Sequence, residues 1–165
     1  MRGPKLQFEH PTQPAASAFV LAAAVGDAAT MWASLSRETR GLLEGLYAAC
    51  AGVSLGVAAG VVGDGADARL GAVLVPLRAA VLEALGAEKI SGYGVSNARL
   101  VDRHLAYVLL LPDFGEERVV EQESWKPSHL LAFVYESREW LLDLAKTAEL
   151  SAEAELPDPL GGIRR

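Results

Sequence analysis

The chain is poor in reactive and aromatic side chains: it has one cysteine, Cys50, three histidines, and aromatic residues at only 7% of its 165 positions. A single cysteine excludes a disulfide within the chain and favours a reducing compartment. The first residues lack the apolar run of a signal peptide. We therefore expect a cytoplasmic (intracellular) protein whose stability comes from an Ala-, Leu- and Val-rich core.

Positive charge is also scarce, because 15 Lys and Arg face 21 Asp and Glu, which gives a net charge of −6. Binding to nucleic acid or to an anionic membrane needs surplus Lys and Arg. Neither is therefore an expected partner. Acidic residues concentrate between positions 113 and 158, where twelve Asp or Glu accompany four Lys or Arg. We expect an acidic surface there.

No constellation of residues indicates catalysis. The histidines are His10, His104 and His129, and none has a Cys or carboxylate at the spacing of a metal site. The Gly63-Asp64-Gly65 turn lacks the Lys and Ser/Thr of a phosphate-binding loop. The sequence thus predicts no catalytic residue, no metal site and no cofactor, and it favours a non-enzymatic protein.

Helix signals dominate the first half of the chain. Pro14 suits the first turn of a helix that extends to about residue 33. Ser36 is a predicted N-cap, Gly52 interrupts the helix that follows, and Ser54 restarts it. A further helix is expected from the break at 63–65 to Leu85, with Gly86 as its stop.

The second half is ambiguous. Residues 100–111 fit helical spacing better than strand spacing, although 107–111 could also be a buried strand. Pro127 and Ser128 are expected to open a last helix. The predicted fold is all-α, a five- or six-helix bundle with at most a small β element near residues 92–122. The predicted organisation is an extended arm (1–14), one helical domain (15–150) and a flexible tail (151–165).

The most unusual stretch runs from Gly45 to Gly63, 19 residues without a charge, in which Gly52, Gly56 and Gly60 recur every fourth position. Such spacing of small residues lets two helices pack closely. The favoured interpretation is a buried core helix or helix pair. Helix-mediated self-association and membrane insertion are the alternatives, since the length just reaches that of a membrane span.

Part of this region resembles the helix-turn-helix of sigma-type transcription factors. The residues that carry the resemblance are Leu35, Ser36, Arg40, Leu42, Leu43 and Tyr47, followed by Gly52-Val53-Ser54-Leu55, Ala59 and Gly63. The resemblance implies a DNA-binding regulator built on residues 35–85. The helix that would enter the major groove carries only Arg69 and Arg78, fewer donors than base and phosphate contacts need.

Aromatic residues of the acidic C-terminal third are the remaining candidates for function. Trp and Tyr bury large areas at low entropic cost and are enriched at interfaces. We predict Trp125, Tyr135 and Trp140, together with Gly52, Gly56 and Gly60, as interaction residues. The leading hypothesis is a helical assembly or adaptor protein that self-associates or binds a protein partner. The alternatives are the helix-turn-helix regulator and a membrane-associated protein anchored by residues 45–63.

Overall fold

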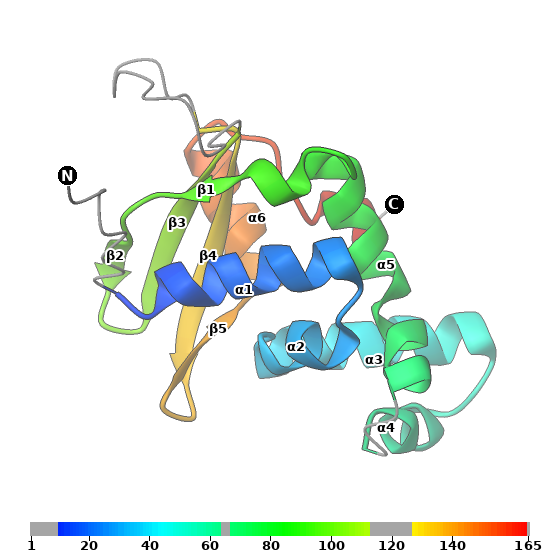
Figure 1. The fold of residues 1–165 in the computed structure, drawn as a ribbon. Helices are drawn as coiled ribbons and strands as arrows, with labels where there is room; N and C mark the ends of the chain where they lie inside the picture. The colour runs from blue at the N-terminus through cyan, green and yellow to red at the C-terminus, as the bar shows by residue number, and fades with distance from the viewer. Residues whose placement is uncertain (1–9, 64–66, 113–126, 165) are drawn as a thin grey trace.

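The computed structural model describes residues 10–63, 67–112 and 127–164, and in these the fold is mixed α/β. Six α-helices accompany a curled five-stranded antiparallel sheet (Figure 1). The expected all-α bundle is therefore wrong. The β structure also extends well beyond the small element expected near residues 92–122, because its last two strands lie after residue 128.

The sheet is a meander. Strands β1 (Gly94–Val95) and β2 (Arg99–Asp102) pair in succession with one edge of β3 (Leu105–Leu111). Strand β4 (His129–Glu136) pairs with the other edge, and β5 (Glu139–Leu142) follows through a two-residue turn. Sequential antiparallel strands need only short connections, so the four-strand order β1-β3-β4-β5 follows the chain.

Each face of the sheet is covered by a helix, which explains why the strands resembled helices in the sequence. Helix α1 (Thr12–Val25) covers the face of Val108, Leu131 and Phe133. Helix α6 (Leu144–Glu153) covers the opposite face, where Leu130 packs with Leu150. With both faces buried, β3 and β4 read as continuous apolar runs rather than as an alternation.

Two predicted helices are consequently strands. Strand β2 and strand β3 occupy residues 99–102 and 105–111, so the helix expected over 100–111 is wrong and the strand alternative is right for 107–111, the part it covered. The helix expected from Pro127 is replaced by the β4–β5 hairpin, closed by Ser137 and Arg138 at positive φ, and helix α6 follows the hairpin. The apolar residues of β4 from Leu130 to Val134 are continuous, as expected for a strand buried on both faces.

The predicted helix up to residue 33 is two helices, α1 and α2 (Ala28–Ala33), separated by Gly26 and Asp27. Gly26 has φ +76°, and Asp27 accepts a hydrogen bond from Thr30 N. Arg78 closes the end of α1, because its guanidinium donates to the carbonyls of Ala23 (2.8 Å) and Ala24 (3.3 Å). The positive charge of Arg78 also interacts favourably with the negative end of the α1 dipole.

The helices between residues 36 and 86 begin and end where the sequence predicts. Helix α3 (Arg37–Ala51) has Ser36 as N-cap and ends at Gly52, which has φ +67°. Helices α4 (Leu55–Gly63) and α5 (Asp67–Leu85) follow, and Gly86 at φ +84° closes α5. These helix ends were predictable because they depend on the type of the capping residue, which is visible in the sequence.

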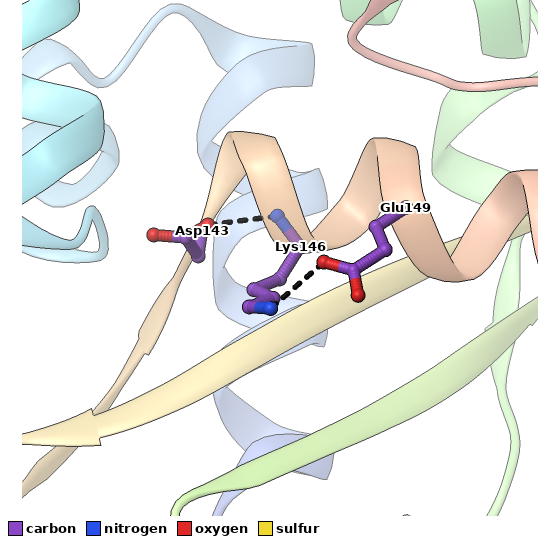
Figure 2. A network of polar contacts seen from close by, with 3 residues as sticks. All are labelled: Asp143, Lys146 and Glu149. Atoms are coloured by element: carbon purple, nitrogen blue, oxygen red, sulfur yellow. Dashed lines mark hydrogen bonds and ion pairs between the residues drawn. The ribbon is translucent and has the colours of Figure 1, made fainter.

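A buried polar junction joins the helices to the sheet. Ser36 Oγ donates to Asp143 Oδ2 at 2.7 Å, and Thr39 Oγ1 accepts from Leu144 N at 2.9 Å. Asp143 is itself the N-cap of α6, accepting from Lys146 N, while the Lys146 ammonium pairs with Glu149 at 2.7 Å on the exposed side (Figure 2). The N-termini of α3 and α6 are therefore fixed to each other.

The segment expected to be a flexible tail packs against the domain. After α6, the 3-10 turn η3 (Gly161–Arg164) lies on α5, and Leu160 and Ile163 are buried in the core. A Cβ on Gly162 would lie 3.2 Å from Ala80 Cβ, so glycine permits this close approach. At the other end, α1 begins at Thr12, inside the residues expected to form the arm.

Candidate functional site

Helix α4 is an apolar helix at the surface, at the end of the molecule away from the sheet (Figure 1). Only Ala58 of its nine residues is buried, whereas Leu55 is 65% and Val57 54% exposed. The interpretation of residues 45–63 as buried core packing is therefore wrong for α4. A helix without charge that leaves large apolar side chains in water is typical of an interaction surface.

Gly56 and Gly60 have no close packing partner in the part of the chain that the structure describes. A Cβ built on Gly60 would meet no atom within 4 Å, and one on Gly56 would meet only Ser54 Oγ at 3.9 Å. Of these three glycines, Gly52 alone has a backbone conformation that favours glycine, because its φ is positive at the end of α3. Among the described residues, nothing fills the space beside Gly56 and Gly60.

No single helix in the described part of the chain is long and apolar enough to cross a bilayer. Helices α3 and α4 together reach that length and composition, but they bend by 117° at the turn between them. Gly52 ends α3 at this turn, and Ser54 caps the start of α4 by accepting from Val57 N. A helix-turn-helix that binds DNA needs basic side chains to contact phosphates and bases. Helix α4 carries no basic residue, and the guanidinium of Arg78 donates to the carbonyls of α1.

A second surface lies where the β4–β5 hairpin meets the start of α1 and the end of α2. An open groove of about 750 Å³ is found there, which we call the hairpin groove. Its lining residues are Pro11, Ala15, Thr30, Ala33, Ser34, Arg103, Tyr135, Arg138, Glu139, Trp140 and Leu141. Two predicted interaction residues, Tyr135 and Trp140, thus lie together in one groove.

Four rings form a row beside this groove. Tyr135 and Trp140 are cross-strand partners, with ring centroids 5.2 Å apart. The His10 ring meets Trp140 edge-on at 4.9 Å, and the His104 ring stacks on Tyr135 at 6.3 Å. The row holds the aromatic side chains in place and leaves Tyr135 40% exposed.

Two guanidinium groups line the same groove. Arg103 and Arg138 are exposed, and neither has a hydrogen bond or ion pair to any described residue. Among the lining residues that the structure describes, Glu139 is the one acidic side chain. Arg138 stands in the left-handed conformation, with φ +67°, in a turn that usually selects Asn and Gly.

The predicted site residues therefore separate into two surfaces, with Gly52, Gly56 and Gly60 on one and Tyr135 and Trp140 on the other. Trp125 lies outside the described residues. The sequence interpretation missed Arg138 because it placed a helix over the β4–β5 hairpin, and it missed Arg103 and His104 because it placed one over residues 100–111. It missed His10 because the contact of this ring with Trp140 joins segments far apart in the chain. The local signal of β4 is its continuous apolar run, which is typical of a strand buried on both faces.

The buried polar junction is not a reactive site. Ser36 is fully buried, and its Oγ is occupied by Asp143 and Thr39. Within the ranges that the structure describes, no group of three His, Cys, Asp or Glu side chains is arranged to hold a metal ion. Cys50 is exposed at the end of α3.

Comparisons of the chain with protein-family models, with curated proteins and with solved structures find no match.

Proposed function

We propose that the protein is a non-enzymatic assembly or adaptor protein that binds a second copy of itself through α4. The observation that supports this most directly is the exposure of Leu55 and Val57 on a helix without charged residues. Burying a Leu or Val side chain contributes about 1.5–3 kcal/mol relative to leaving it in water. A partner that covers this face gains that contribution.

A second copy of the chain is the partner that fits best. An uncharged face needs an uncharged face opposite, since an unpaired charge buried against it would be costly. The chain itself supplies such a face, and a two-fold axis would bring α4 onto α4 of the other copy. The open space beside Gly56 and Gly60 lets the two backbones approach closely.

Sedimentation velocity over a range of concentrations tests this proposal. The wild-type chain is expected to sediment as a dimer that dissociates on dilution. Leu55→Glu should raise the dissociation constant at least about tenfold, because it places a carboxylate inside the apolar contact.

Leu100→Glu is the matched control. Leu100 is 63% exposed on β2, close to the 65% of Leu55, so both changes remove a similar exposed side chain. The control should sediment like the wild type. A wild-type monomer at every concentration would contradict self-association, as would equal effects of the two substitutions.

The same preparation distinguishes the other two functions. If the protein floats with phosphatidylcholine vesicles and Leu55→Glu abolishes this flotation, the partner of α4 is a lipid surface and not a second copy. A salt-dependent gel shift with duplex DNA would instead support the regulator implied by the helix-turn-helix resemblance.

A further inference from the structure

The outer edge of β5 has one strand position with no partner among the described residues. Tyr135 N donates to His104 O at 2.8 Å, so the backbone polar groups of Tyr135 face β3. The cross-strand pair Tyr135–Trp140 is therefore a non-hydrogen-bonded pair. It follows that the N–H and C=O of Trp140 point away from β4, toward the groove.

The next outward-facing backbone groups on this edge, those of Leu142, are already hydrogen-bonded within the chain. Leu142 N donates to Ser34 O at 2.7 Å, and Ser36 N donates to Leu142 O at 2.8 Å. This short parallel bridge involves Leu35 and extends no further along β5. An extended segment lying in the hairpin groove would continue the pairing at Trp140, as peptides do at open sheet edges.

The side chains that line the groove define the chemistry of such a segment. Trp, Tyr and Arg dominate binding energy at interfaces, and Trp140, Tyr135 and two arginines all lie here. Arg103 and Arg138 outnumber Glu139, and a guanidinium binds a carboxylate through two parallel hydrogen bonds. The groove therefore complements an acidic segment.

We propose that the hairpin groove binds an extended acidic segment of a partner protein, which adds as a strand to the edge of β5 and places carboxylates against Arg103 and Arg138. Single-stranded nucleic acid also uses aromatic and arginine contacts. The open backbone edge and the carboxylate of Glu139 favour a peptide instead. The site is distinct from α4 and does not depend on self-association.

A random dodecapeptide phage library selected on the full-length protein supplies the probe. Acidic sequences should be enriched, and a fluorescein-labelled peptide from them should bind in fluorescence anisotropy. Arg103→Gln and Arg138→Gln should each raise Kd at least about fivefold, as expected for a lost charged hydrogen-bonded pair. Arg99→Gln, an exposed arginine of β2 outside the groove, should change Kd less than about twofold.

The backbone contribution is tested on the peptide. Methylating its amide nitrogens one at a time should weaken binding at alternate positions, because successive N–H groups of a strand point to opposite sides. Loss with a period of two supports strand addition, whereas equal or no loss at every position would overturn it.

Three other outcomes would overturn the proposal: no enriched sequence, enrichment without excess Asp and Glu, or tighter binding of a fluorescein-labelled oligothymidine than of any selected peptide. Leu55→Glu should leave peptide binding unchanged. Failure of this inference is therefore distinguishable from failure of the α4 interface.

Discussion

Ser137 and Arg138 close the β4–β5 hairpin in the left-handed conformation, with φ 51° and 67°. This conformation is costly for residues with a Cβ, and two-residue hairpins usually select Asn-Gly or Gly-rich turns instead. A bulky arginine is therefore retained at a position where glycine would be more stable. Its guanidinium, which lines the hairpin groove, is the feature that glycine would lose.

Replacing Arg138 by glycine should stabilise the fold and weaken groove binding together. Arg138→Gly relieves the left-handed strain, so the free energy of unfolding should rise by about 0.5–1 kcal/mol after the entropic cost of glycine. Arg138→Ala is the control, since it also removes the guanidinium but keeps the Cβ, and should give no such gain. Urea denaturation measures both variants; equal stability of the two would contradict the strain.

His129 makes stability depend on pH. It is buried at the start of β4, and burial lowers its pKa below the usual value, opposed in part by the negative charge of Asp158. The unfolded chain therefore binds a proton more readily than the folded one. The contribution of neutral His129 is fully present above the unfolded pKa, near 6.5, and is lost as pH falls below it.

The unfolding free energy of the wild type should consequently decrease between about pH 7.5 and about pH 5.5 on account of this histidine. His129→Asn removes the titrating group and keeps a polar atom near the Nδ1 position that lies 2.8 Å from Ser128 Oγ. The variant should lose less stability over the same interval. Equal losses in urea denaturation at the two pH values would show that His129 does not contribute.

At the scale of elements, capping chemistry was predictable from the sequence and strand pairing was not. Ser36 begins α3, and Gly52 and Gly86 end α3 and α5, at the positions that the local sequence predicts. Strands β3 and β4 required knowledge of their partners, because burial on both sheet faces removes the polar alternation that identifies a strand. Tyr135 and Trp140 were singled out by residue type, whereas their contact depends on the hairpin.

The two aspartate N-caps should differ in importance. Asp143 is buried and accepts from both Ser36 Oγ and Lys146 N, so Asp143→Ala leaves buried donors unpaired and should cost about 2–3 kcal/mol. Asp27→Ala removes two hydrogen bonds that Thr30 donates from its backbone N and its hydroxyl, but these lie at the exposed start of α2, so the change should cost clearly less. Urea denaturation ranks the two, and the reverse order would contradict the junction.

Glycine replacements in α4 separate folding from association. Nothing lies within 4 Å of a Cβ on Gly60, so Gly60→Ala should stabilise the monomer by about 1 kcal/mol through helix propensity. The added methyl should weaken self-association, because it holds the two helices apart. Gly71→Ala on α5, also unobstructed, should stabilise without changing association. Thermal unfolding and sedimentation of the two variants measure these effects, and stronger association of Gly60→Ala would contradict the close approach.

The whole molecule places its two candidate surfaces on different elements. Helix α4 belongs to the group of helices beside the sheet (Figure 1). The hairpin groove is lined by residues of the β4–β5 hairpin and of α1 and α2. One surface is uncharged and helical, and the other combines aromatic rings, guanidinium groups and an open strand edge. A chain with two such surfaces suits an adaptor, since a dimer formed through α4 would present two grooves and bind a divalent partner more tightly than either groove alone.

The distance between the α4 helices of two copies tests the proposed dimer most directly. A spin label on Ala59→Cys, an exposed position of α4, in a Cys50→Ser background reports that distance by double electron–electron resonance. If α4 forms the dimer contact, the labels on two copies should show dipolar coupling at concentrations where the protein is dimeric, and Leu55→Glu should abolish it. A dimer in which the α4 labels show no coupling, or a coupling that Leu55→Glu leaves unchanged, would contradict this contact.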